Sequence, residues 1–327
     1  MTNIQKVAKH ANVSVATVSR VINGAGNVTP KTKQRVEQAI AELNYVPNML
    51  ARNFRTSKSK SILVILSNIS NLFYMEIVHG ISKYANECGY DILLSETDDI
   101  PERQIECLEK VKNRIADGAV LLESIVYDKA LLSMEKSYPI VQCCTDNDEI
   151  PLPYVMADNV KGGYLATREL IEKGHRKLAF VGTDDQSKYN RERCEGFLKA
   201  VHEAGIEEKD VVIDYTELSL KGGRMAVKNL LEKKVEGVFF ASDMQAIGAI
   251  QYLRNRGVGV PEDIAIVGYD NLEMCDIIEP PLTSIDQHAW EMGRESARIL
   301  IERIEDRHTQ GNRHVVFQPE LVRRKSV

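Results

Sequence analysis

A short stretch near the start of the chain concentrates side chains that could recognise a phosphate backbone and base edges. Residues 13–23 read VSVATVSRVIN, in which hydroxyl and amide side chains surround one arginine. Hydroxyl and amide groups suit hydrogen bonds to phosphate oxygens, and the stretch offers Ser14, Thr17, Ser19 and Asn23. Arg20 suits a bidentate contact to guanine, while Val15 and Ala16 suit apolar contact with thymine methyl groups. The residue types favour a surface that reads nucleic acid, although small helical units also bind proteins.

Three short helices are predicted to carry this stretch. Apolar residues recur at helical spacing from residue 4 to residue 11, which predicts a first helix. Ser14 is a good N-cap for a second helix over about residues 15–21. Thr29 and Pro30 supply a cap with proline at the first helical position, so a third helix is expected to begin there. Three short helices with a tight first turn are typical of a helix-turn-helix unit.

Charge is distributed unevenly along the chain. Residues 1–60 hold ten Lys and Arg against two Glu, a net charge of +8. Because the whole chain carries −5, the remaining residues must carry −13. A basic head on an acidic body indicates an anionic partner for the head alone. Nucleic acid is the first candidate and a membrane surface the second.

Length and composition indicate an ordinary globular protein of two or three structural units. The chain has 327 residues, of which 43% are hydrophobic and 27% charged. The longest apolar run, Ile62 to Leu66, is far shorter than the roughly 20 residues that a membrane-spanning helix needs. The N-terminus lacks the pattern of a secretory signal, so a cytoplasmic location is expected.

The cysteines favour reduced, mostly buried thiols. Six of them are dispersed along the chain without a C-x-x-C pair, which argues against a zinc site or a redox motif. Cys143 and Cys144 are adjacent, and we expect their side chains on opposite faces of a buried strand.

After Ser61 the pattern changes to apolar strands that alternate with helical segments. The predicted strands include SILVILS, YDILLSE and GAVLLES, and later KLAFVGT, GVFFASD and IAIVGYD. Continuous apolar strands between helices are typical of parallel sheets covered on both faces. Eight or more strands in this region favour two doubly wound, Rossmann-like sheets. A single (β/α)₈ barrel of about 250 residues is the alternative.

Enzyme motifs are not found in the sequence. It has no G-x-S-x-G, Walker loop or H-E-x-x-H, and its seven histidines show no metal-ligand spacing. Asp270 ends a predicted strand, where an acid in an open α/β sheet faces the ligand crevice. That position suits a catalytic carboxylate or plain ligand binding. Without a partner base or nucleophile, binding is preferred, with no catalytic residue, metal or cofactor expected.

Several motifs in combination resemble one family. VSVATVSRVIN, NVTPKTKQRVEQAIAELNYVPN and ARNF resemble the headpiece and hinge of the LacI/GalR family of bacterial transcriptional repressors. ISNLFYMEI, DGAVLLE, RERCEGF, ASDMQAIGAI and VPEDIAIVGYDN are similar to its sensor domain, which is of the periplasmic-binding-protein type I fold. The resemblance covers essentially the whole chain.

The resemblance implies an all-α headpiece followed by an α/β sensor. The headpiece would span residues 1–46, the hinge helix and linker residues 47–60, and the effector-binding and dimerisation domain residues 61–327. Within that domain, an N-subdomain would combine about 61–157 with 288–315. A C-subdomain would combine about 160–285 with 316–327.

The family hinge helix orders on operator DNA and wedges an apolar side chain into the minor groove. By resemblance, the hinge contacts here would come from Asn48, Ala51, Arg52 and Phe54. A wedge unstacks a base step and kinks the duplex, and the extra protein contact offsets the cost. Phe54 stands where members generally have leucine, which affects operator preference at the central step. Packing of Phe54 on the sensor is the alternative.

The resemblance also implies an effector site in the sensor cleft. The matching residues are Asn71, Phe73, Tyr74, Arg193, Ser242, Asp270 and Gln287, with Arg191 as the alternative to Arg193 if the register differs. Aromatic faces would cover a ring, and the arginine and aspartate would bind hydroxyls or ring heteroatoms. Cys144 and Thr145 replace the Asp-Arg pair of sugar-binding relatives. A free sugar is therefore not assured, and a nucleoside, base or modified sugar stays open.

The leading hypothesis is a homodimeric repressor that binds a palindromic operator under control of a small molecule. Inducers and corepressors would use the same cleft, so the sign of control is open. A protein corepressor acting on the sensor is an alternative. A solute-binding protein is disfavoured by the basic headpiece, and an α/β enzyme by the missing catalytic pairs. The ending ELVRRKSV shows no heptad pattern, which favours a dimer.

Overall fold

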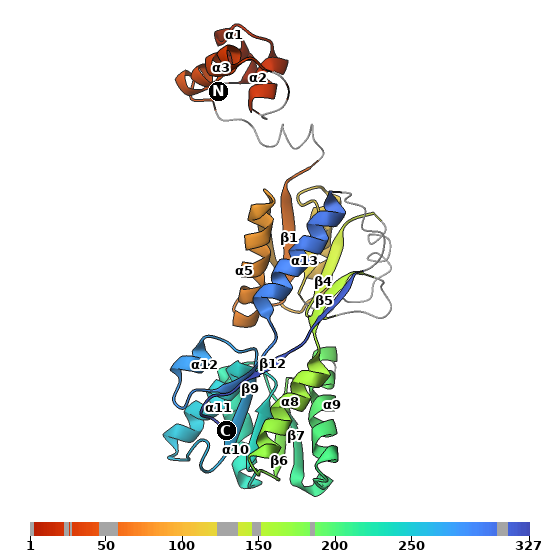
Figure 1. The fold of residues 1–327 in the computed structure, drawn as a ribbon, viewed down its shortest axis with the longest axis vertical. Coiled ribbons are helices and arrows are strands. Elements are labelled where there is room, and N and C mark those ends of the chain that lie inside the picture. The colour runs from red at the N-terminus through yellow and green to blue at the C-terminus, as the bar shows by residue number, and fades with distance from the viewer. Residues whose placement is uncertain are drawn as a thin grey trace. The chain divides into compact units, whose positions relative to one another are not determined.

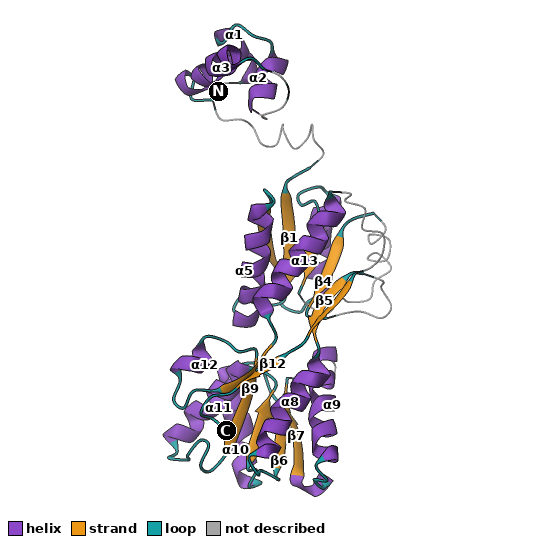
Figure 2. Ribbon diagram, in the orientation of Figure 1, coloured by secondary structure: helices purple, strands orange, loops and turns teal. Residues whose placement is uncertain are grey.

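The computed structural model divides the chain into two compact units, Met1–Ser59 and Lys60–Val327 (Figure 1). It describes residues 3–22, 26, 28–45, 58–122, 137–145, 152–183, 187–305 and 313–327. The first unit is helical, and the second combines helices with two sheets (Figure 2). Within those residues, no helix is both long enough and apolar enough to cross a membrane.

The described residues of the first unit form three helices: α1 (Ile4–His10), α2 (Val15–Ile22) and α3 (Pro30–Glu42). They pack around a small apolar cluster centred on Val7, Val18 and Val36, each of which is fully buried. The predicted caps are present, because Ser14 Oγ accepts from the Thr17 amide at 3.1 Å and Thr29 Oγ1 from the Thr32 amide at 3.4 Å. The three predicted helices of the helix-turn-helix unit, and the N-caps of the second and third, are confirmed.

The first sheet of the second unit has six parallel strands. Their spatial order is β11 (His314–Phe317), β5 (Tyr154–Ala157), β4 (Ile140–Cys143), β3 (Ala119–Leu121), β1 (Ser61–Leu66) and β2 (Asp91–Glu96). Helices α5 (Leu72–Glu87) and α13 (Ala289–Ile304) cover one face, and α6 (Pro101–Lys112) covers the other.

The second sheet also has six strands, all parallel except for one edge. Their order is β12 (Glu320–Val322), β10 (Thr283–Asp286), β9 (Ala265–Tyr269), β8 (Gly237–Phe240), β6 (Leu178–Gly182) and β7 (Val211–Tyr215), with β12 antiparallel to β10. Helices α8 (Asn159–Glu172) and α9 (Lys188–Glu203) cover one face, and α10 (Leu220–Glu232) and α11 (Asp243–Asn255) the other. A 3₁₀ turn (Glu208–Asp210) and the short α12 (Met274–Ile277) complete this half.

The prediction of two doubly wound sheets is therefore confirmed, and the single barrel is wrong. Three short strands, β10, β11 and β12, were not predicted as strands. Each has only three or four residues. The sequence of β10 is mostly polar, and β11 and β12 have no buried residue, so none of the three resembles a buried apolar strand. Their pairing depends on the chain crossing between the sheets.

The chain crosses between the two sheets at three short segments. These segments join β5 to α8, β10 to α13 and β11 to β12, and each is at most three residues long. Two of these segments begin at the carboxyl ends of strands β5 and β10. Strands that run parallel to β5 and β10 have their carboxyl ends on the same side of the sheet. The carboxyl ends of both sheets therefore lie toward the crossover segments.

Helices α5 and α13 pack with their backbones in close contact, side by side on the first sheet (Figure 1). A methyl group added at Gly80 would lie 2.1 Å from the carbonyl oxygen of Trp290. One added at Gly293 would lie 2.0 Å from that of Ile77. Only glycine fits at these two positions, so the pair is held at a fixed, short separation.

The expectation that Cys143 and Cys144 lie on opposite faces of a strand is wrong. Strand β4 ends at Cys143, and Cys144 follows with a left-handed φ of 74°. This turn brings the two sulfur atoms to 3.8 Å from each other. Both residues, like the other four cysteines, are free thiols.

Candidate functional site

The start of α2 presents an exposed polar surface on the first unit. Ser14, Val15, Ala16 and Arg20 are exposed, whereas Val18 points into the core. Ser14 both caps the helix and lies 2.9 Å from the hydroxyl of Thr17, so these two side chains are held in place before any ligand arrives. Arg20 is also exposed, on the same helix.

The remaining predicted contacts of this surface differ in their placement. Thr17 and Ser19 are half-buried. The other two helices of this unit also carry exposed basic side chains: Lys6, Lys9, Lys31, Lys33 and Arg35. Asn23 and the hinge residues Asn48, Ala51, Arg52 and Phe54 lie outside the described residues.

In the second unit, Arg193 on α9 is the centre of a buried polar cluster. It is 6% exposed, and its three nitrogens donate to Asn159 Oδ1 at 3.0 Å, Ala241 O at 2.6 Å and Gln287 Oε1 at 3.3 Å. Its guanidinium carbon lies 3.7 Å from the ring centroid of Tyr269. A buried guanidinium with these contacts has a fixed position.

Asp270 joins this cluster through Gln287. The Gln287 amide nitrogen donates to Asp270 Oδ1 at 2.8 Å, while its oxygen accepts from Arg193. Asp270 follows β9 with a φ of 115°, a conformation that L residues rarely adopt. Burial raises the pKa of Asp270 well above its usual range, although Arg193 acts to lower it. Burial likewise raises the pKa of Tyr269 to about 12.

The other predicted effector residues form two separate groups. Asn71 caps α5 by accepting from the Phe73 amide at 3.1 Å, and the rings of Phe73 and Tyr74 lie 6.1 Å apart. Phe73 is only 7% exposed and packs in the apolar core. Ser242 is buried and caps α11 by accepting from the Met244 amide. Hydrogen bonds thus join Arg193, Gln287 and Asp270 in one series, whereas Asn71 and Ser242 act as helix caps.

The alternative arginine lies in a different environment. Arg191 is exposed on α9, whereas Arg193 is buried in the cluster. The structure therefore favours Arg193 as the arginine of this site.

Three members of the cluster escaped the sequence analysis. Asn159 at the start of α8 is 3% exposed and accepts from both Arg193 and Tyr269. Tyr189 lies with its ring centroid 5.0 Å from the Arg193 guanidinium. Tyr269 stands directly before Asp270 in the motif VPEDIAIVGYDN, so this adjacency was the available signal for Tyr269.

Cys144 brings the first sheet to this cluster. Both Arg193 and Asp270 act electrostatically on its thiol, although burial is the main reason that the pKa of Cys144 is raised well above its usual range. A neutral thiol thus stands at the end of β4, near the arginine and the aspartate.

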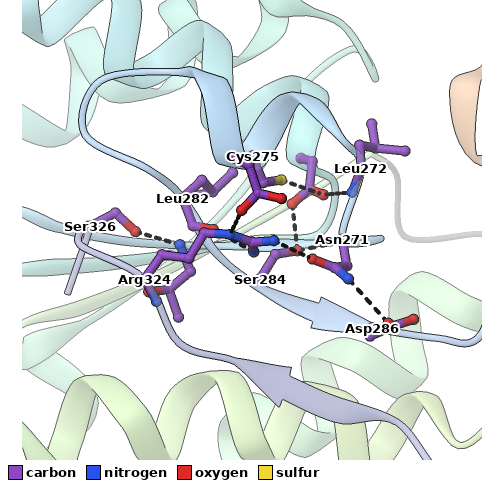
Figure 3. A network of polar contacts seen from close by, with 11 residues as sticks. Asn271, Leu272, Cys275, Leu282, Ser284, Asp286, Arg324 and Ser326 are labelled. Carbon is purple, nitrogen blue, oxygen red and sulfur yellow. Dashed lines mark hydrogen bonds and ion pairs between the residues drawn. The ribbon is translucent and has the colours of Figure 1, made fainter.

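A second polar network holds the loops that carry Ser242 and Asp270 (Figure 3). The fully buried Asp243 accepts from Ser284 Oγ at 2.6 Å, the Leu272 amide at 2.8 Å and Cys275 Sγ at 3.1 Å. Asn271 donates to Asp286 Oδ2 at 3.0 Å and accepts from Arg324 Nη2 at 2.9 Å. The residues next to Ser242 and Asp270 are therefore fixed by the C-terminal segment and by strand β10.

The chemistry of the cluster suits binding. An arginine, a carboxyl group, two amides and a phenol can hydrogen-bond hydroxyls or ring heteroatoms, and aromatic rings can cover an apolar face. Among the residues that the structure describes, no group of three or more His, Cys, Asp or Glu could hold a metal ion.

Comparisons with known proteins agree with both units. Bacterial regulatory proteins of the lacI family match residues 3–48, and the periplasmic binding protein-like domain matches residues 167–327. The HTH-type transcriptional regulator RegA of Clostridium saccharobutylicum is 36% identical over 330 residues, covering 99% of each chain. The transcriptional regulator CelR in complex with cellobiose is 33% identical, with a TM-score of 0.74 over 100% of both chains. The Lac repressor dimer bound to operator and the anti-inducer ONPF is 26% identical, with a TM-score of 0.89 over 99% of this chain and 98% of that chain.

The two units and these matches define a class of protein: DNA-binding transcriptional regulators with a periplasmic-binding-protein-like domain. The named relatives are regulators and not enzymes. This chain belongs to the LacI family of bacterial regulatory proteins.

Proposed function

We propose that the protein is a dimeric repressor whose affinity for a palindromic operator is set by a small molecule bound in the second unit. The observation that carries this proposal is the hydrogen-bonded series Arg193, Gln287 and Asp270 at the carboxyl ends of the second sheet. Ligands of open α/β sheets bind at this edge. The other unit presents a helix-turn-helix surface, so ligand and operator would occupy different units.

Operator recognition is assigned to α2. Its N-terminal residues would enter the major groove, with Arg20 on a guanine, Val15 and Ala16 on thymine methyl groups, and nearby hydroxyls on phosphates. Residues 1–46 would form the headpiece and residues 47–60 the hinge, where Phe54 would wedge the minor groove. Support comes from the exposure of Ser14, Val15, Ala16 and Arg20 on α2.

The effector is proposed to be a neutral, hydroxylated ligand of the sugar or nucleoside class. Asn71, Phe73, Tyr74 and Ser242 would complete the site around the Arg193 cluster. CelR was solved with cellobiose, which supports a carbohydrate. Cys144, near Arg193 and Asp270, is a neutral thiol. The part of the ligand that faces Cys144 would therefore need no charged group.

Dimerisation is supported by exposed apolar side chains in the second unit. Leu94 on the edge strand β2 and Leu72 at the start of α5 are each 40% exposed, and Ile277 on α12 is 81% exposed. Apolar side chains at an unpaired sheet edge suit a contact with a second copy. Light scattering of Ile277→Lys and Leu94→Lys, expected to show weakened dimers, tests this surface.

The experiment that tests the proposal combines two measurements on the full chain. Duplexes selected from a random pool by the wild-type protein give the operator, and a thermal-shift panel of sugars, nucleosides, bases and sugar phosphates gives the effector. We expect one palindromic sequence and at least one compound that changes operator affinity. No selected sequence would refute the repressor, and an operator without any responsive compound would favour a protein corepressor.

A further inference from the structure

Helix α13 connects the Arg193 cluster to the first residue of the second unit. The helix has 16 residues, a length of about 24 Å. Gln287, which joins Arg193 to Asp270, stands two residues before its start. Glu305, the C-cap at the other end, accepts a hydrogen bond from Lys60 Nζ at 3.3 Å. One helix thus has the cluster at one end and Lys60 at the other.

Lys60 is held in place by both its backbone and its side chain. Its amide donates to Asp117 Oδ2 at 2.9 Å, and its carbonyl oxygen accepts from the Asp91 amide at 2.9 Å. Its Nζ lies 4.1 Å from the ring centroid of Tyr90, which is 1% exposed. The backbone of Lys60 has a φ of 56°, so the direction in which the chain enters β1 depends on these contacts.

Helix α13 is suited to transmit a shift because it is firmly packed along its length. Gly80 and Gly293 bring the backbones of α5 and α13 together, so neither helix can slide freely past the other. Arg294 adds a two-point contact to Glu87 on α5, at 3.1 and 2.8 Å. The two helices would therefore move as one body, and a displacement of Gln287 that shifted this pair would carry Glu305 with it.

We propose that Lys60 is a positioning residue that receives the state of the effector cluster through α13 and sets how the chain leaves the second unit toward the DNA-binding unit. This assignment rests on the proposed function. Lys60 touches neither the cluster nor DNA in this scheme. It acts through Glu305 and Tyr90, and it is the last residue before β1.

A double-mutant cycle on operator affinity tests the assignment. Lys60→Met keeps the aliphatic stem and removes the charge, and Gln287→Leu breaks the link between Arg193 and Asp270. When two distant sites are independent, the change in affinity of the double variant equals the product of the two single changes within about twofold. We expect the double variant to differ from the product of the single effects by about fivefold or more. Agreement within twofold would overturn the proposal.

The matched control pairs Gln287→Leu with Lys112→Met. Lys112 lies on α6, on the opposite face of the first sheet, and is paired with Glu109 of its own helix. This cycle is expected to be multiplicative. If Lys60→Met lowers the melting temperature strongly, Glu305→Gln breaks the same contact from the helix side and enters the same cycle.

Hydrogen exchange gives a readout that needs no operator. Gln287→Leu is expected to speed exchange at the amides of Lys60 and Asp91, while the amides of β7 keep their wild-type rates. If exchange at these amides becomes faster but the protein selects no DNA, the connection through α13 holds and the proposed repressor function is refuted. Unchanged exchange at Lys60 and Asp91 would refute the connection, even where operator binding is normal.

Discussion

Arg193 and Asp270 are bridged by a single amide, that of Gln287, which accepts from the arginine at 3.3 Å and donates to the aspartate at 2.8 Å. The bridge keeps a buried cation and a half-buried carboxyl group connected, which limits the cost of removing them from water. A ligand with both a hydrogen-bond acceptor and a donor could take over either contact. Gln287 would then move, and because it precedes α13, the helix would respond.

Replacing the carboxyl group of Asp270 is expected to weaken effector binding. Asp270→Asn keeps an oxygen for Gln287 and tolerates positive φ, but loses one carboxyl oxygen that could hydrogen-bond the ligand. We expect an affinity loss of about two- to tenfold, from about 0.5–1.5 kcal/mol for such a bond. Calorimetry with the compound that gives the largest thermal shift measures it. Asp276→Asn, on the exposed side of α12, is the control and should bind normally; equal affinities for all three proteins would contradict the site.

Arg20 is expected to supply base specificity. Arg20→Ala should cost about 1–3 kcal/mol of operator binding and relax the preference at one position, as for a bidentate guanine contact. Competition binding with single-base operator variants measures both effects. Lys33→Ala, an exposed lysine on α3 paired with Glu37, should weaken all sequences slightly and equally. An equal loss on every sequence for Arg20→Ala would make Arg20 a phosphate contact instead.

The α5 and α13 contact is expected to tolerate no side chain at Gly293. Gly293→Ala places a methyl group against the carbonyl oxygen of Ile77 and should destabilise the second unit by about 1–3 kcal/mol. Glu291→Ala, exposed on the same helix, should stay within about 0.5 kcal/mol of wild type. Urea unfolding of both variants measures the difference. A neutral Gly293→Ala variant would show that the two helices separate easily.

Asp243 is expected to make stability depend on pH. Burial raises the pKa of Asp243 to about 6, above its ordinary value of 3.8, although its hydrogen bonds act to lower it. A raised carboxyl pKa means that the folded state binds more protons than the unfolded state between these values. Its contribution is therefore present below about pH 4 and is lost as the pH rises through about 6, by up to about 3 kcal/mol.

The comparison that isolates this contribution is wild type against Asp243→Asn. The variant loses one acceptor and should be less stable at low pH, and the gap should narrow as the pH rises from 4 to 7. Denaturant unfolding at several pH values measures the gap. Asp276 has a pKa lowered mainly by its hydrogen bond with Arg324, so Asp276→Asn should show the opposite trend. A constant gap for Asp243→Asn would show that Asp243 does not titrate in this range.

Local sequence patterns were enough to predict the helices and strands whose conformation depends on neighbouring residues in the sequence. Ser14, Thr29 and Pro30 determine where α2 and α3 begin, because caps act on the nearest turn. Continuous apolar runs such as residues 62–66 could be predicted as buried strands, because both faces of a parallel strand are covered. The family resemblance supplied Arg193, Asp270 and Gln287 as candidates, and the basic headpiece indicated the kind of partner.

Only the tertiary structure decided how distant residues combine. Strands β10, β11 and β12 exist because the chain crosses between two sheets, and their short sequences carry no comparable signal. The same crossings bring Asn159, Arg193 and Gln287 into one hydrogen-bonded cluster, although they are far apart in the sequence. The contact of Lys60 with Glu305 spans almost the entire second unit in sequence. The amino-acid sequence by itself determined the residue types and the local elements, whereas these partnerships depend on packing that no local pattern encodes.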